Sequence, residues 1–348
     1  MRRIILLLLL LAASANKVQA AEFAFTAPQV PSVGAEIMIE PTNDFLQDLL
    51  NILNKALPHV QPALSEAAKI CLRVLGVVIL LSILHMFVSM DHGVIQITGT
   101  ISLSILLLSA SKAMIPLGVD TIQELSNYNK LLLPVMTTAL AAQGSATTSG
   151  ALYVGTAFFD SILSSSINSF LVPGIYVFLA LTIAANSLDE PMIQKFKESV
   201  KSAITWFLKI ALLVFTGYMT ISGAVSGSTD AMAMKATKIT ISTAVPAIGG
   251  ILADASEAVL VSASLMKNTA GIYGIFAVLA IVIGPFLRIG AQYILLKLTS
   301  TICSSIGPKN TASLISDFAA ALGLILAMTA AVSVMVLISV VCFMRVVS

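Results

Sequence analysis

The sequence predicts an all-α membrane protein, a polytopic bundle of helices that crosses the bilayer six to eight times. Two observations lead to this fold class. Of the 348 residues, 57% are hydrophobic and only 10% are charged, against about 25% charged in an ordinary soluble domain. Apolar runs of about twenty residues also recur along the chain, which is the length that crosses a hydrocarbon core of ~30 Å.

The first twenty residues predict a cleavable secretory signal peptide. Arg2 and Arg3 precede an apolar run over 4–13, and Val18, Gln19 and Ala20 form a small-x-small cleavage signature. The apolar run is short for a membrane span, although an uncleaved signal anchor is the alternative. Cleavage would place the mature N-terminus outside the cytoplasm.

Residues 21–69 predict an extracytoplasmic lead followed by an amphipathic helix. The lead has several prolines and no helical period, whereas apolar residues return at helical spacing from Asn43 onward, with polar residues between them. Pro58 and Pro62 are expected to interrupt this helix. We expect it to lie on the membrane surface or to pack on a partner.

Residues 70–348 predict the multi-span domain. Clear spans are expected at 70–90, 94–115, 170–188, 204–225, 270–289 and 318–344, and weaker ones at 131–142, 151–167, 239–265 and 291–306. Polar connectors are expected at 116–129 and 226–238. The short, interrupted segment 131–150 is typical of re-entrant or discontinuous membrane helices; a loop beside a weak span is the alternative.

Charge gives one indication of orientation. Residues 189–201 hold Lys195, Lys197 and Lys201 and lead into Trp206, a pattern typical of an amphipathic helix at the cytoplasmic surface. If Arg345 is cytoplasmic too, the chain must cross the membrane an even number of times between residues 189–201 and Arg345. That condition favours counting either 239–265 or 291–306 as a crossing.

The sequence indicates no enzyme. It has no GxxxxGK[ST] phosphate loop, no HExxH and no GxSxG, so we expect neither catalytic residues nor a cofactor. Its three cysteines have no CxxC spacing, which argues against a metal site. A net charge of +2 without a basic stripe argues against nucleic-acid binding.

Ionisable residues within apolar runs are the candidates for function. Asp254 and Glu257 stand three residues apart on one helical face of an otherwise membrane-like segment, where acids are costly and face protein or water. We interpret them as lining or bracing a conduit. Further candidates are Asp160, Lys209 and Asp317, with Arg288 and Lys297 beside them; for the long basic chains, reaching the membrane interface from a helix end is the alternative.

Two sequence elements resemble the stage III sporulation protein AE family. They are PVMTTALAA at 134–142 and AVPAIGG at 244–250, the latter followed by LADASEAVLVSASLMKN. The order of elements is similar as well, and the resemblance extends over about 40–348.

This resemblance implies a multi-pass protein of the mother-cell membrane around the forespore. There it would be a membrane-core component of a channel or secretion-like apparatus required for endospore formation. The implied partners are other membrane proteins of the stage III sporulation operon and a separate cytoplasmic ATPase. The family supplies no catalytic residues.

Two points stay open at this stage. A stand-alone secondary transporter with a midplane solute site is the alternative function. The second open point is which helix packs against the small residues Ala320, Gly323 and Ala327, which allow close approach. It belongs either to a second copy of this chain or to a partner protein.

Replacing both Asp254 and Glu257 by Leu is expected to leave the protein inserted but inactive, because apolar side chains insert readily but cannot line or brace a polar path. Membrane fractionation measures insertion, and rescue of the deletion phenotype measures activity. Full activity of the double variant would contradict the interpretation.

Overall fold

The computed structural model describes residues 28–39, 45–87, 92–188, 190–244 and 249–345. Within these ranges the side chains at 33, 85–87, 92–96, 224–244, 249–266 and 309 are not described. The predicted signal peptide therefore lies outside the described residues, as does much of the lead, and both stay predictions.

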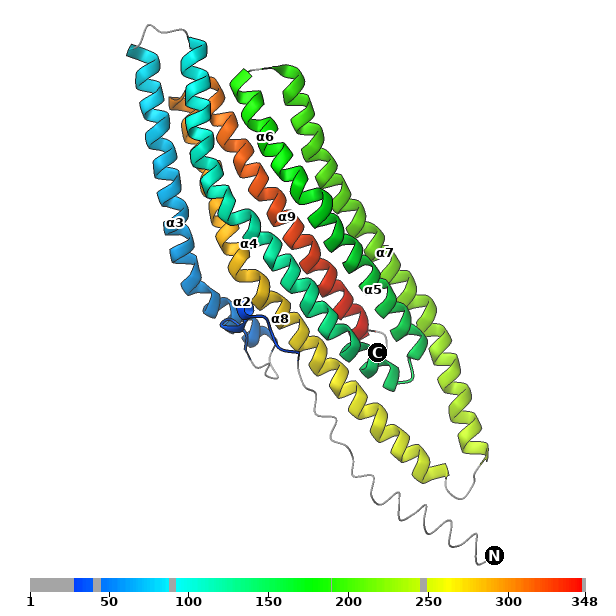
Figure 1. Cartoon of the computed structure of the whole chain (residues 1–348). Helices are drawn as coiled ribbons and strands as arrows, with labels where there is room; N and C mark the ends of the chain where they lie inside the picture. The colour runs from blue at the N-terminus through cyan, green and yellow to red at the C-terminus, as the bar shows by residue number, and fades with distance from the viewer. Residues whose placement is uncertain (1–27, 40–44, 88–91, 189, 245–248, 346–348) are drawn as a thin grey trace, which may run out of the picture.

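All regular structure in the described residues is helical, which confirms the all-α class. Six long rods run alternately up and down along one axis (Figure 1). They are α3 (Phe45–Phe87), α4 (His92–Ala142), α5 (Ala146–Ser166) continued by η1 (Ile167–Leu171) and α6 (Val172–Leu188), α7 (Pro191–Ala244), α8 (Gly249–Ile306) and α9 (Lys309–Arg345); the short α2 (Ser32–Ala35) precedes them.

Six segments of these rods are long and apolar enough to cross a membrane, which is the lower end of the expected range. They are Phe45–Leu84, Ile97–Ala142, Ala146–Leu188, Pro191–Gly223, Lys267–Ile306 and Asn310–Arg345. Each is far longer than the ~20 residues that a bilayer requires. The protein is therefore a polytopic membrane bundle whose helices extend beyond the hydrocarbon.

The expected connector at 116–129 is wrong, because these residues form the middle of α4. They are helical because their apolar residues lie on one face: Ile122, Leu125 and Tyr128 are buried in the core, while Asp120 and Gln123 face outward. Pro116 and Pro134 are accommodated inside the helix, as neighbouring helices permit in membrane bundles.

The segment at 131–142 is the last part of α4 and forms no separate re-entrant helix. The chain turns only at 143–145, where Gly144 has a φ of 86°, a backbone conformation that glycine adopts without strain. The expected spans at 151–167 and 170–188 likewise merge into one rod, because the π-helical turn η1 joins α5 to α6 without a break.

Three further boundaries differ from expectation. The predicted connector 226–238 is helical and belongs to α7. Segment 239–265 makes no crossing of its own, since it holds the end of α7 and the start of α8. Segment 291–306 is the last part of α8, which ends before Gly307 and Pro308.

The lead and the amphipathic segment also join the bundle. Residues 45–69 are continuous with the first expected span in α3, and Pro58 and Pro62 lie inside that helix instead of ending it. Figure 1 shows α3 bending in its N-terminal part, as proline causes. In the described part of the lead, α2 packs on α8, and Ile37 is buried against Phe276.

The two ends of the bundle carry different features. The turn before α7 lies at one end, which we call the lysine end after Lys195, Lys197 and Lys201. Three rods, α7, α8 and α9, separate it from Arg345, which lies at the opposite end (Figure 1). Because three is an odd number, the condition that both basic groups lie in the cytoplasm is not met, and the two groups face opposite sides.

At the end opposite the lysines, α7 and α8 continue past the other helices (Figure 1). Gly271 of α8 faces Met344, near the end of α9, so the α8 residues before it extend beyond α9. We call residues 224–244 and 249–266 the α7–α8 extension.

Helix α9 fills the centre of the bundle. It contacts α4, α5, α6, α7 and α8. Many of its large apolar side chains are fully buried, among them Phe318, Ile325, Met328, Val332 and Phe343, while Val334 and Val341 face outward. Helix α9 therefore occupies the axis of a single copy at the level of these residues.

Glycine sets how closely α5 approaches α7. A Cβ atom on Gly155 would overlap the ring of Tyr218, whose hydroxyl donates to the carbonyl of Ala151 at 3.0 Å. This hydrogen bond holds the ring in place, so the ring cannot move aside without losing it.

Gly155→Ala is expected to destabilise the protein by about 1–3 kcal/mol, because it overpacks the α5–α7 contact. Gly150→Ala is the matched control, since a Cβ there meets no described atom within 4 Å and alanine favours helix. Thermal unfolding in detergent compares the two. An equal unfolding midpoint for both variants would argue against the close contact.

Candidate functional site: two buried polar clusters

The first polar cluster lies near the lysine end and joins α7 to α9. Lys197 Nζ donates to Asp317 Oδ2 at 2.6 Å. The side chains are only 5% and 19% exposed, so most of the attraction between their charges is shielded from water. Breaking such a pair leaves the remaining charge buried and uncompensated.

A second lysine connects α8 to the same turn of α9. Lys297 Nζ donates to Ser316 Oγ at 2.7 Å, one residue before Asp317. Closer to the end of the bundle, the carbonyl of Asn186 accepts from Thr100 at 3.5 Å and from Asn310 at 3.4 Å. Polar contacts therefore link α4, α6, α7, α8 and α9 within this part of the bundle.

The second cluster surrounds Asp160, further toward the opposite end. Asp160 is 1% exposed, and its Oδ2 accepts from Ser126 Oγ of α4 at 2.7 Å. Its other oxygen, Oδ1, is buried and has no hydrogen-bond partner among the described residues. Asn129 is buried on the adjacent turn of α4, and its Nδ2 is likewise unpaired within the described part of the chain.

One turn away, α5 contacts α7 and α9 through a further polar pair. The hydroxyls of Thr156 and Ser339 lie 2.9 Å apart, and Thr156 Oγ1 lies 3.8 Å from Met219 Sδ. Buried hydroxyls of this kind hydrogen-bond across membrane helices and fix their register. The Asp160 cluster and this pair together connect α4, α5, α7 and α9.

The residues predicted from the sequence separate into three groups. Asp160 and Asp317 lie inside the bundle, in different clusters. Lys209 lies on its outer surface, and Arg288 forms an exposed ion pair with Glu66 at 3.7 Å. Asp254 and Glu257 lie in the α7–α8 extension with side chains outside the description, so their proposed role stays a prediction.

Sequence reasoning missed the two strongest partners. The sequence predicts Lys197 as a surface charge and Ser126 in a polar connector, whereas both side chains are buried. Lys197 and Asp317 are 120 residues apart, so no local pattern indicates the pair. The helical period of α4 indicates Ser126, because it lies four residues after the buried Ile122 and so on the same face.

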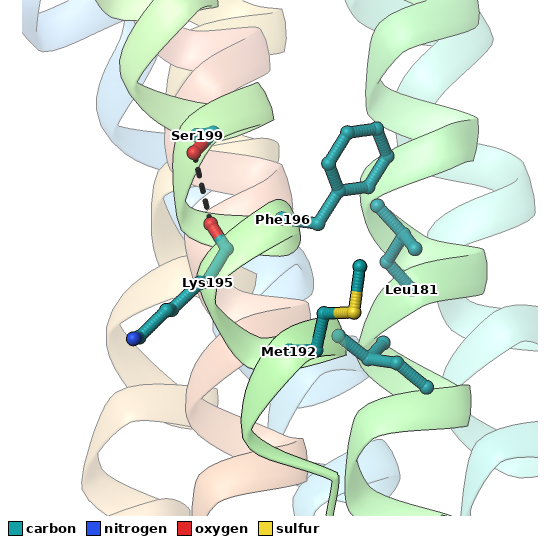
Figure 2. Close-up of a pocket in the computed structure, with 6 residues that line it drawn as sticks. Leu181, Met192, Lys195, Phe196 and Ser199 are labelled. Carbon is teal, nitrogen blue, oxygen red and sulfur yellow. Dashed lines mark hydrogen bonds between the residues drawn. The ribbon is translucent and has the colours of Figure 1, made fainter.

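A shallow groove marks the outer surface at the lysine end (Figure 2). It has a volume of about 380 Å³ and lies between α6 and α7, where Leu181, Met192 and Phe196 line it. The Lys195 side chain points away from these apolar groups in Figure 2. The groove is thus mainly apolar, and the residues that line it include no acidic side chain.

The clusters are suited to holding helices together more than to catalysis. Each pairs one acid with donors from another helix, and within the described residues no group of three histidine, cysteine or acidic side chains could hold a metal ion. Their geometry fixes the register of the rods inside an apolar surrounding.

Comparison with known proteins gives one family. The family model described as Stage III sporulation protein AE matches residues 36–346. The Bacillus subtilis (strain 168) protein of that name is 22% identical over 245 residues, which covers 68% of this chain and 61% of the relative. The chain thus aligns with less than two thirds of that relative's length. No solved structure matches the chain.

Replacing Asp317 by Ala is expected to destabilise the bundle by about 3–5 kcal/mol, because Lys197 is left buried without a partner. The double variant Lys197→Met/Asp317→Leu should recover most of this loss. Unfolding midpoints of Lys197→Met, Asp317→Leu and the double variant in detergent form the mutant cycle that measures the coupling.

Glu66→Ala is the control for an exposed pair, and we expect it to cost less than about 1 kcal/mol. If Asp317→Ala were as mild as Glu66→Ala, the 197–317 pair would not hold α7 to α9.

Proposed function

Because this chain belongs to the stage III sporulation protein AE family, and so to a family that acts in endospore formation, we propose a specific role for it. It is a membrane-core component of the channel or secretion-like apparatus between mother cell and forespore. The observation that carries the proposal is the family match, which runs over 36–346 and so includes all six rods. In this role the protein lies in the mother-cell membrane around the forespore.

The orientation of the bundle supports a role in a structure that bridges two membranes. In this proposal the lysine end faces the mother-cell cytoplasm, the side on which short loops rich in lysine remain. The α7–α8 extension lies at the opposite end (Figure 1) and then projects into the space between the two membranes. There its helices are positioned to contact components of the apparatus on the forespore side.

The absence of a nucleotide-binding motif from the sequence supports dependence on partners. Energy for transport must then come from a partner or an ion gradient, and a separate cytoplasmic ATPase is the source that we propose. Other stage III membrane proteins of the operon complete the assembly. The Lys197–Asp317 and Ser126–Asp160 contacts serve as internal braces in this role.

Deletion of the gene in its own host is expected to stop sporulation after engulfment, because the forespore would then lose its connection to the mother cell. Fluorescence microscopy of the membranes identifies the stage, and the count of heat-resistant spores gives the yield. Complementation with the wild-type gene is the control. Normal spores from the deletion strain would refute the proposal.

Purified protein in liposomes distinguishes this role from that of a stand-alone secondary transporter. A platform component should move no solute alone, and should co-purify with operon neighbours from sporulating cells. Ion-driven uptake by the isolated protein would favour the transporter instead.

A further inference from the structure

Asp160 is a buried acid without a counter-charge. It forms no ion pair within the described part of the chain, whereas the charge of Asp317 is balanced by Lys197. A carboxylate that is buried and ionised on its own has a high free-energy cost, so such a group is neutralised by a cation or by a proton. Asp160 therefore needs a positive charge that its neighbours do not supply.

The groups around Asp160 confirm this need. Helix α5 contacts α4, α7 and α9. Near the level of Asp160, the charged and titratable side chains on these four helices are Lys130, Glu124 and Tyr128 on α4, Tyr153 on α5, Tyr218 on α7 and Cys342 on α9. Lys130 is the one positive charge among them, and it is exposed and not paired with Asp160. Elsewhere α7 is uncharged over 210–229 and α9 over 318–344.

Polar atoms without partners lie beside the carboxyl group. Oδ2 of Asp160 accepts from Ser126, but the buried Oδ1 has no hydrogen-bond partner among the described residues. Ser164 stands one turn further along the same face of α5, and its buried hydroxyl is equally unpaired in the described part of the chain. The amide of Asn129 approaches the carboxyl group from α4. Buried polar atoms left unpaired in this way indicate a bound water or ion.

The charge and the surrounding atoms indicate a monovalent cation. Within the described residues, no group of three acidic, histidine or cysteine side chains could hold a metal ion. A divalent ion on one carboxylate would keep an unbalanced positive charge in an apolar surrounding. Carboxylate, hydroxyl and amide oxygens suit a hard cation such as Na⁺, and a carboxylate oxygen also takes up a proton. Acids inside membrane bundles commonly mark the sites of such ions.

The inner face of the rod is polar on one side of Asp160 and apolar on the other. The residues of α5 buried before Asp160 are Thr148, Ser149, Leu152, Gly155 and Thr156, three of which carry hydroxyls. Beyond Asp160 the buried residues are apolar from Leu163 as far as Leu179. A small cation thus meets polar atoms on its way to Asp160 from the end opposite the lysines.

We propose that Asp160 is the binding site of one monovalent cation, a proton or Na⁺, which is held at the free Oδ1. The bond between Oδ2 and Ser126 persists when the cation is bound, so the contact between α4 and α5 is kept. This site goes beyond the proposed function, because it lets the chain respond to an ion gradient without a nucleotide.

Thermal unfolding of the purified full chain in detergent tests the site, since a cation that binds only the folded state raises the unfolding midpoint. If Na⁺ is bound, replacing choline chloride by NaCl at constant ionic strength should raise the midpoint by at least about 2 °C. If a proton is bound, the midpoint should instead rise as the pH is lowered from about 8 to about 6. Aspartates of the unfolded chain stay ionised over this range, so only the folded state gains the proton.

Asp160→Asn and Asp160→Leu should each remove this dependence, because neither side chain carries a charge to be neutralised. In choline chloride at about pH 8, where the wild-type site is least occupied, their midpoints should equal or exceed that of the wild type. Asp120→Asn is the matched control, since Asp120 is an exposed acid on α4, and it should keep the wild-type response.

Two outcomes would overturn the proposal: a wild-type midpoint that responds to neither Na⁺ nor pH, or Asp160 variants that respond as the wild type does. The assay measures binding by the purified chain, and the deletion experiment measures sporulation. The cation site and the proposed function can therefore fail separately.

Discussion

The whole bundle depends on the packing around α9. Lipid is as apolar as leucine, so helices in a membrane gain little from hiding apolar side chains and must associate through close packing and polar contacts. Helix α9 meets both needs. Its apolar side chains fill the axis, while Asp317 and Ser339 reach out to α7 and α5. The other rods take their register from these contacts.

The class of the fold could be predicted from composition and hydropathy, but the lengths of the helices could not. The expectation of twenty-residue spans divides a sequence at each proline, glycine or polar patch. Residues 116–129 show why that division fails. They are polar on one side only, and their other face continues the apolar stripe of α4. A search for helical period across polar stretches would have joined the two parts.

The candidate site was predictable only in part. Acids in apolar runs indicate Asp160 and Asp317, of which Asp160 is buried and Asp317 is half-buried against Lys197. Their partners come from other helices, and nothing in the local sequence distinguishes the buried Lys197 from the exposed Lys195 and Lys201. Long-range pairing in a bundle depends on the rotation of each rod about its axis, which one sequence does not give.

The unbroken length of α7 has a mechanical consequence. Its 54 residues form a rod about 80 Å long, and no proline interrupts it. A stiff rod acts as a lever, so a tilt of about 5° displaces its far end by about 7 Å relative to a fixed near end. Force applied to the α7–α8 extension on one side of the membrane would thus reach the Lys197–Asp317 contact near the other side without a hinge to absorb it.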